Sequence, residues 1–161
     1  MEVIAKIEFT TPCLGGVRRD DCDLMQRDRD GNVIFMPSWW KAALTKAAKA
    51  LSKYHRMVEH IYPALVLNGQ TTIIRRQFGP KPKDFKCHEG FDTGASVTCG
   101  FTIPYGTTIE QFTELLEAVG MYIGVSPYGW QTNYGRFRVL SVESAAKAKK
   151  IVAKEQILEG Q

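Results

Sequence analysis

GMYIGVSPYGWQTNYGRFR, residues 120–138, joins a helix pattern over 107–119 to a strand pattern that begins at 136. Glycines let a backbone approach a ligand closely, because they carry no Cβ atom. Four aromatic side chains in or beside this stretch offer flat faces on which bases can stack, and two arginines suit phosphate binding. These residues are Tyr122, Tyr128, Trp130, Tyr134, Arg136 and Arg138. The stretch is therefore predicted to be a surface for a polyanion rather than a catalytic pocket.

Outward from this stretch, hydrophobic periodicity predicts five strands and three helices. The strands are expected at 2–10, 61–67, 71–78, 97–103 and 136–142. The helices are expected at 37–54, 107–119 and 144–157. An Asn68–Gly69 pair predicts a hairpin between the second and third strands. The helix at 107–119 should start with a capping box from Thr107 to Glu110 and end at Gly120.

Two polar segments are expected to be insertions in a single domain that covers residues 1–161. The first, at 11–32, ends in a hairpin turn at Asp30–Asn32 that returns as a strand at Val33–Met36. The second, at 79–95, is rich in proline, glycine and lysine and is expected to be a mobile loop. Without these insertions, the element order predicts an α+β, ferredoxin-like (RRM-like) split βαβ fold with hairpin insertions. Such a sheet has one open face, on which RRM-type domains stack bases.

Bulk composition is that of an ordinary globular protein. Apolar residues make up 44% of the 161 residues and charged residues 24%, and no apolar run approaches the roughly 20 residues that span a bilayer. We therefore expect a cytoplasmic protein without a membrane partner. The four cysteines lack a CxxC pair, so free thiols are expected, with no metal and no cofactor. The alternative is a split zinc site built from Cys13, Cys22, Cys87 and His88.

Positive charge is concentrated in the middle of the chain. The net charge is only +4, but residues 37–83 hold nine basic groups and one acidic group. Such a concentration is typical of a nucleic-acid binder, although a solvated lysine-rich helix face gives the same pattern. Arg75 and Arg76 should point to opposite faces of one strand. The candidate RNA contacts in the glycine-rich stretch are Tyr128, Trp130, Tyr134, Arg136 and Arg138. The others are Arg18, Arg19, Lys41, Lys46, Lys49, Arg75 and Arg76.

Three motifs in order resemble the CRISPR-associated RAMP superfamily. FTTPCLGG (Phe9–Gly16) is similar to its strand-to-loop signature, and VIFMPSWWKAAL (Val33–Leu44) is similar to the start of its first helix. GMYIGVSPYGWQTNYGRFRV (Gly120–Val139) resembles its C-terminal glycine-rich loop. The resemblance implies a ferredoxin-like fold that binds RNA, often with the glycine-rich loop against the RNA backbone. It also allows a stand-alone relative or one from a phage or mobile element.

The favoured function is RNA binding, with the phosphate backbone on the basic surface and the glycine-rich loop. An alternative is a protein-interaction or assembly module, which mimics a CRISPR subunit, inhibits assembly or self-associates. A second alternative is a metal-independent RNA endonuclease with His55, expected at the end of the first helix, as its general base. The absence of other catalytic motifs argues against an enzyme. Trp39, Trp40 and Tyr122 are expected to pack in the interior or under the loop.

Overall fold

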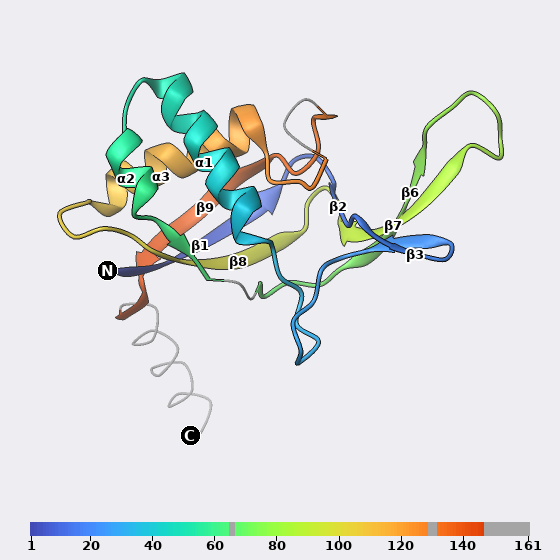
Figure 1. Ribbon diagram of the computed structural model, residues 1–161, viewed down its shortest axis with the longest axis horizontal. Coiled ribbons are helices and arrows are strands. Elements are labelled where there is room, and N and C mark those ends of the chain that lie inside the picture. The colour runs from blue at the N-terminus through green and yellow to red at the C-terminus, as the bar shows by residue number, and fades with distance from the viewer. Residues whose placement is uncertain (65–66, 129–131, 147–161) are drawn as a thin grey trace.

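The computed structural model describes residues 1–64, 67–128 and 132–146, which form two β-sheets and a layer of helices (Figure 1). The main sheet is antiparallel, with the strand order β5-β8-β1-β9. Its strands are β1 (Glu2–Phe9), β5 (Tyr62–Pro63), β8 (Ser96–Thr102) and β9 (Phe137–Ser144). The helices are α1 (Pro37–Leu51), α2 (His55–Glu59), α3 (Ile109–Ala118) and a π-helical turn, η1 (Val119–Ile123). This order of strands and helices confirms the predicted α+β, ferredoxin-like fold.

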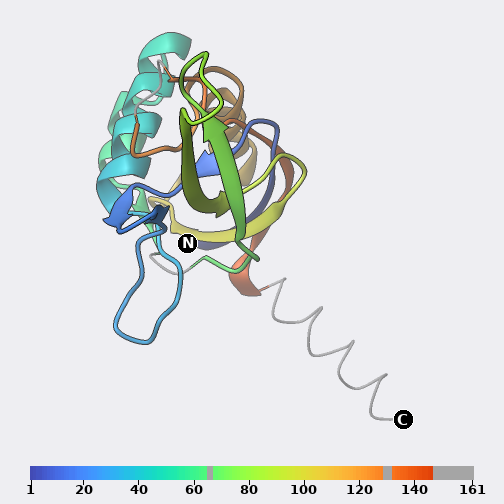
Figure 2. The same cartoon turned by 90° about the vertical axis from the view of Figure 1, so that its right-hand side faces the viewer.

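The helices cover one face of the main sheet, and the hydrophobic core lies between them (Figure 2). Alternate side chains of β1, from Val3 to Phe9, are buried on this side, because successive residues of a strand point to opposite faces. The Trp40 ring of α1 packs edge-on against Phe101 of β8, with 4.9 Å between ring centroids. Small alanine side chains elsewhere on this face of α1 allow the helix to lie close to the sheet.

The helix ends differ from the predictions by a few residues. α1 ends at Leu51 rather than at residue 54, because Ser52 takes a left-handed conformation with φ 54°. His55 is therefore the first residue of α2 and not the end of the first helix. The capping box of α3 runs from Thr108 to Gln111, one residue later than predicted. The expected stop at Gly120 is also wrong, because η1 continues the helix to Ile123.

The predicted hairpin at Asn68–Gly69 is wrong. β5 has only two residues and pairs with β8, and Asn68 bridges Thr98 of the same strand. The hairpin instead joins β6 (Thr72–Gln77) to β7 (Phe85–Phe91), a strand inside the segment that was expected to be a mobile loop. The strand expected at Val33–Met36 is reduced to isolated bridge positions at Val33 and Ile34, of which Val33 pairs with Arg27.

A second sheet contains β6 and β7 together with β2 (Cys13–Leu14), β3 (Val17–Arg19) and β4 (Cys22–Leu24). The β6–β7 hairpin projects from the body of the molecule (Figure 1). Paired residues of neighbouring strands share a face, so the register places two rows of side chains across this sheet. One row contains Arg75, Cys87, Cys22 and Arg19. The row on the opposite face contains Ile74, His88, Asp23 and Arg18.

β9 runs to Ser144, and most of the helix expected at 144–157 lies outside the described residues. None of the helices that the structure describes is both long and apolar enough to cross a membrane.

Candidate nucleic-acid interface

Tyr128, in the glycine-rich loop, reaches across to the second sheet. Its hydroxyl lies 3.2 Å from the Gly15 carbonyl oxygen, 3.3 Å from Asp23 Oδ2 and 3.4 Å from His88 Nδ1. The Phe9–Gly16 motif and the glycine-rich loop, which are more than 100 residues apart, therefore meet at this hydroxyl. We call the residues around it the Tyr128 cluster: Tyr128, Asp23, Lys86, His88, Arg76 and Arg18.

Glycines make this contact possible. A Cβ atom on Gly15 would lie 2.5 Å from the Leu24 carbonyl carbon, and one on Gly16 would lie 3.2 Å from Cγ of Pro127. The first distance is shorter than any real contact, so the turn could not approach β4 with another residue at that position. The close approach lets the Gly15 carbonyl oxygen accept hydrogen bonds from the His88 side chain of β7 and from the Tyr128 hydroxyl.

His88 is a structural member of the cluster and not part of a mobile loop. It lies in β7 with none of its surface exposed. Its Nδ1 is 2.9 Å from the Gly15 carbonyl oxygen, so this nitrogen carries the proton and donates it. Its Nε2 then accepts from Nε of Arg76, 3.4 Å away. Both ring nitrogens of His88 therefore have hydrogen-bond partners inside the cluster.

The Tyr128 cluster has an excess of positive charge. Asp23 is 6% exposed and forms an ion pair with Lys86, with 3.0 Å between Nζ and Oδ2. Burial alone would raise the pKa of the Asp23 carboxyl, but the hydrogen bond and charge of Lys86 outweigh it and hold the pKa below its usual range. Arg18 and Arg76 are near enough for their charges to act on the Tyr128 hydroxyl. Three cations thus face one carboxylate.

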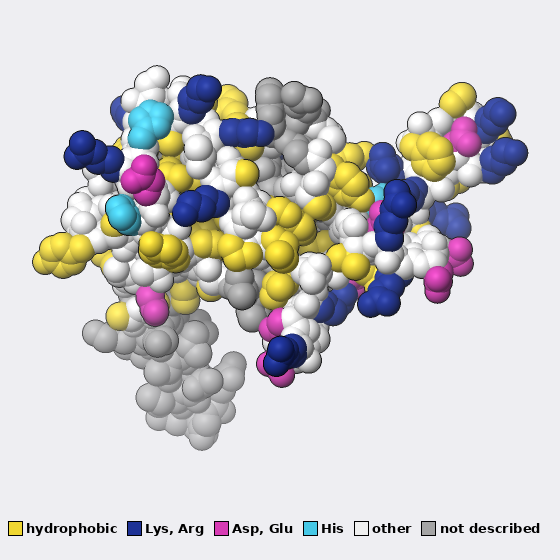
Figure 3. Space-filling view, viewed as in Figure 1, with side chains coloured by type: hydrophobic (Ala, Val, Ile, Leu, Met, Phe, Trp, Pro, Cys, Tyr) yellow, Lys and Arg dark blue, Asp and Glu magenta, His cyan; other side chains and the backbone are white. Residues whose placement is uncertain are grey.

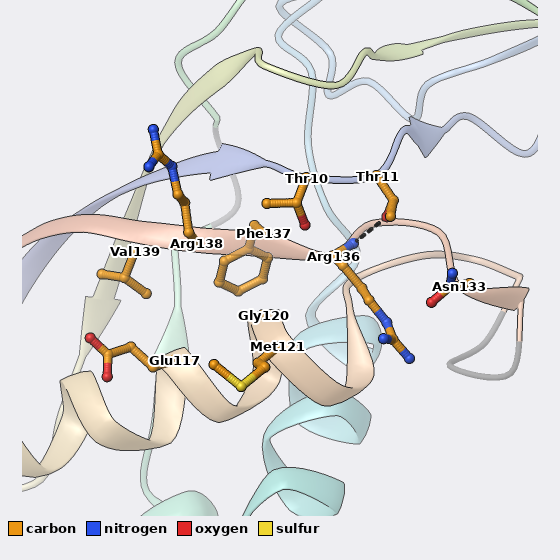
Figure 4. A pocket seen from close by; sticks show the side chains of 10 residues that line it. All are labelled: Thr10, Thr11, Glu117, Gly120, Met121, Asn133, Arg136, Phe137, Arg138 and Val139. Carbon is orange, nitrogen blue, oxygen red and sulfur yellow. Dashed lines mark hydrogen bonds between the residues drawn. The ribbon is translucent and has the colours of Figure 1, made fainter.

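Arg136 lies on the other side of the same loop, in a cavity of about 620 Å³ (Figure 4). Its backbone N–H donates to Thr11 Oγ1 over 2.9 Å, and its Nη2 donates to the Tyr122 carbonyl oxygen over 3.3 Å. Its Nε is buried without a hydrogen-bond partner. Glu117, from α3, lines the same cavity. The terminal nitrogens of the guanidinium, and not the buried Nε, could hold a phosphate oxygen at the edge of the loop.

Arg138 is placed differently from Arg136. It lies on the open face of the main sheet and pairs with Glu8, with 3.0 Å between Nη2 and Oε1. The register places three acids on this face among the described strands, Glu2, Glu8 and Glu143, against two bases, Lys6 and Arg138. The aromatic residue that the described strands place there is Tyr62, at the edge. The open face therefore lacks the basic, aromatic character of an RRM-type stacking surface.

Lysines of α1 form a second cationic area. Lys41, Lys46 and Lys49 are exposed, and the last two line a shallow cavity of about 550 Å³ together with Tyr122. Tyr122 was expected to pack in the interior but is 54% exposed, whereas Trp40 is buried and Trp39 is partly buried, as predicted. Figure 3 shows basic side chains on one face of the molecule, over α1 and over the second sheet.

The remaining candidate contacts are dispersed. Arg19 and Arg75 lie on the face of the second sheet opposite the Tyr128 cluster, and the Arg75 guanidinium lies 6.0 Å from the Phe85 ring centroid. Arg75 and Arg76 thus point to opposite faces, as predicted. Tyr134 is half-buried, with its ring centroid 6.5 Å from that of Tyr128. Trp130 lies outside the described residues.

Among the described residues, none that lines the cavity beside His55 is an acid–base partner for it. Its side chain is exposed and lines a shallow cavity whose lining contains neither a carboxylate nor a second histidine. In the described part of the chain, no group of three or more histidine, cysteine, aspartate or glutamate side chains could hold a metal ion. The four residues of the split zinc site do not converge, because the strand register places Cys22 and Cys87 on one face of the second sheet and His88 on the other.

Sequence patterns missed Lys86, Asp23 and His88 as members of the site. β7 reads FKCHEGF and does not alternate between apolar and polar residues, so its sequence gives no strand signal. A usable signal was the Gly15–Gly16 pair, which marks a place where another part of the backbone approaches closely.

No protein-family model and no curated protein matches the sequence. Comparison of the fold with solved structures does find similar chains, and two of them belong to CRISPR complexes. A chain of the Type III-B Cmr-beta complex bound to cognate target RNA has a TM-score of 0.53 at 11% identity. That match covers 88% of this chain and 59% of the Cmr-beta chain, so this protein spans less than two thirds of that neighbour. A chain of a Type IV-B CRISPR complex has a TM-score of 0.60 at 9% identity, with 91% of this chain and 92% of that chain covered. At such identities the likeness concerns the fold alone.

Proposed function

We propose that this chain is a CRISPR-associated, RAMP-like protein that binds single-stranded RNA. The observation that carries the proposal is the convergence of Arg18, Arg76 and Lys86 around Tyr128, beside the glycine-rich loop. Cations grouped beside an aromatic ring suit a phosphate backbone with a base stacked near it. A neighbour of the same fold comes from a complex bound to target RNA, which supports the proposal.

In this proposal the Tyr128 cluster holds one part of the RNA backbone, and Arg136 and the α1 lysines extend the surface. Tyr122 connects Arg136 with the α1 lysines. Its carbonyl oxygen accepts a hydrogen bond from Arg136, and Tyr122 lines the same cavity as Lys46 and Lys49. Arg138 has no part in this path, because Glu8 compensates its charge on the open face.

The test is fluorescence anisotropy with a labelled single-stranded RNA at increasing salt concentration. The variant replaces Arg18 and Arg76 with glutamine, which removes two charges from the cluster. Each lost phosphate contact should weaken binding and reduce the slope of log K against log salt by about 0.7, so we expect a reduction of about 1.4. A variant that binds with the parent's affinity and slope would refute the proposed site.

Arg56→Gln and Lys53→Gln, combined, are the matched control. They remove two positive charges at and near α2, which lies at the opposite end of the molecule from the second sheet (Figure 1). We expect this control to bind RNA almost as tightly as the parent. Circular dichroism of both variants before the titration excludes unfolding as the cause of weaker binding.

An assembly role is the second candidate, and the β6–β7 hairpin favours it. Ile73, Phe78 and Phe85 are exposed apolar side chains on this projecting element. Exposed apolar clusters of this kind are typical of protein-interaction surfaces. If the hairpin mediates self-association, light scattering will show a mass above that of the monomer, and Phe78→Ser with Phe85→Ser will return it to the monomer mass. A monomer at high concentration would count against self-association.

A further inference from the structure

Two of the four cysteines face each other across neighbouring strands of the second sheet. Cys22 of β4 and Cys87 of β7 are direct partners in the parallel register, and their thiols are near enough to affect each other's ionisation. Neighbouring strands lie about 4.8 Å apart, which falls inside the range of about 4.4–6.8 Å between Cα atoms of disulfide-bonded residues. The backbone geometry therefore permits a bond between these sulfur atoms.

The surroundings of this pair suit reaction with an anionic disulfide. Both cysteines are half-buried, so small molecules can reach them. The register places Arg75 on one side of the pair and Arg19 on the other, on the same face of the sheet. Arginines attract anions, so the two guanidinium groups could draw an anionic disulfide to the pair. Burial and the neighbouring Cys87 thiol raise the pKa of Cys22 to about 11, so Cys22 is mostly a thiol at neutral pH and the exchange should be faster at alkaline pH.

The other two cysteines provide an internal comparison. Cys13 and Cys99 also lie close enough to act on each other electrostatically, but both are buried in the core between the main sheet and its helices. Burial raises the pKa of Cys99 to about 12 and that of Cys13 further still. Without access to solvent, this second pair should not react in the folded protein.

We propose that Cys22 and Cys87 form a reversible disulfide by exchange with a small anionic disulfide such as oxidised glutathione. One protein thiolate attacks a sulfur of the small disulfide, which forms a mixed disulfide and releases one small thiolate. The second cysteine, as a thiolate, attacks the protein sulfur of the mixed disulfide, which closes the Cys22–Cys87 bond and releases the second small thiolate. The two protons lost by the cysteines end on the released thiolates. The protein dithiol is oxidised and the small disulfide is reduced, so electrons balance.

The bond would fix the only described pairing between β4 and β7, which consists of Cys22 with Cys87 and Asp23 with His88. The second pair belongs to the Tyr128 cluster. Oxidation would therefore tie the β3–β4 ribbon covalently to the β6–β7 hairpin directly beneath that cluster.

The experiment treats the full chain with excess oxidised glutathione at mildly alkaline pH, blocks the remaining thiols with iodoacetamide after unfolding, and measures intact and peptide masses. The expected result is a loss of two hydrogens and a fall from four alkylated cysteines to two. Digestion with trypsin and chymotrypsin separates the cysteines, because cleavage at Arg19 divides Cys13 from Cys22 and cleavage at Phe91 divides Cys87 from Cys99. The linked peptides should contain Cys22 and Cys87.

Cys22→Ser is the matched control. It should keep glutathione on Cys87 as a mixed disulfide, because no second thiol is present to displace it. The proposal is overturned if all four cysteines of the parent are alkylated, if the parent keeps glutathione as a stable adduct, or if the linked peptides contain Cys13 or Cys99.

Discussion

Tyr128 shows how one side chain can position a long loop. Its hydroxyl reaches the Gly15 carbonyl, the Asp23 carboxylate and His88, which belong to a turn and to two strands. Burial, and then the nearby Asp23 carboxylate, raise the pKa of Tyr128, so the hydroxyl remains a donor at neutral pH. Its role in the structure is therefore to hold the loop against the second sheet while its ring stays near Tyr134.

Tyr128→Phe should lower the free energy of unfolding by about 1 kcal/mol, because the buried Asp23 carboxylate and the Gly15 carbonyl both lose a neighbouring donor. Urea denaturation followed by circular dichroism measures this change. Tyr105→Phe is the control, since Tyr105 is fully exposed and should change stability by less than about 0.5 kcal/mol. Equal stability of the two variants would show that the Tyr128 hydroxyl does not hold the loop.

Gly135→Ala should lower the free energy of unfolding by more than the positive φ of Gly135 alone would cause. Gly135 has φ +73°, and a Cβ atom there would overlap the Val125 carbonyl oxygen on the facing part of the glycine-rich loop. Gly106→Ala is the matched control, with φ +86° and nothing within 4 Å of the added Cβ. We expect a loss of about 1–2 kcal/mol for the control and a larger loss for Gly135→Ala in urea denaturation. A similar loss for both would contradict the close approach of the loop strands.

At the scale of elements, β7 organises the second sheet because it pairs with β6 on one side and with β2 and β4 on the other. The Glu89 side chain of β7 also connects this strand to two other segments through hydrogen bonds. Its carboxylate accepts from the Met25 N–H, the Thr71 hydroxyl and the Arg27 guanidinium, whose Nη1 is 2.6 Å from Oε1. The segment that contains Met25 and Arg27, the segment that contains Thr71, and β7 itself therefore meet at the Glu89 carboxylate.

This arrangement predicts an acid-sensitive contact. The hydrogen bond from Arg27 is the largest of several effects that hold the pKa of Glu89 below its ordinary value. A carboxyl with a lowered pKa in the folded protein contributes stability that is present above its unfolded pKa and is lost as pH falls through the folded pKa. The parent should therefore lose more stability than Glu89→Gln between about pH 5 and pH 3 in urea denaturation. Identical pH profiles would contradict this role of Glu89.

The main sheet and its helices could be predicted from the sequence, because β1, β8, α1 and α3 each have one buried side and a regular apolar period. Of the second sheet, only β6 was predicted, from the strand pattern at 71–78. The rest could not be predicted, because β2, β3 and β4 have only two or three residues each and the central strand, β7, carries Lys86, His88 and Glu89. The Asn68–Gly69 signal was misleading: pairing of Asn68 with Thr98 placed that segment beside β8, and β6 paired with β7 instead.

For the whole molecule, the candidate site was predictable in part. Arg18, Arg76 and Tyr128 were selected by residue type, and the structure brings them together. Their meeting depends on strand register between segments that are more than 50 residues apart, which no local pattern contains. Register also separates Arg138 from the site, because its neighbour in the strand pairing is Glu8. The open face of the main sheet, where RRM-type stacking was expected, has a mixed charge instead.

Ultraviolet cross-linking to a single-stranded RNA, followed by peptide mass spectrometry, tests most directly where RNA lies. Our account predicts adducts on the peptide that contains Tyr128 and on peptides of the β6–β7 hairpin, and their loss when Arg18 and Arg76 are both replaced by glutamine. Tyr62, on the open face of the main sheet, and the exposed Tyr105 serve as aromatic references within the same molecule. Adducts confined to Tyr62 or Tyr105, with none near Tyr128, would contradict the proposed interface.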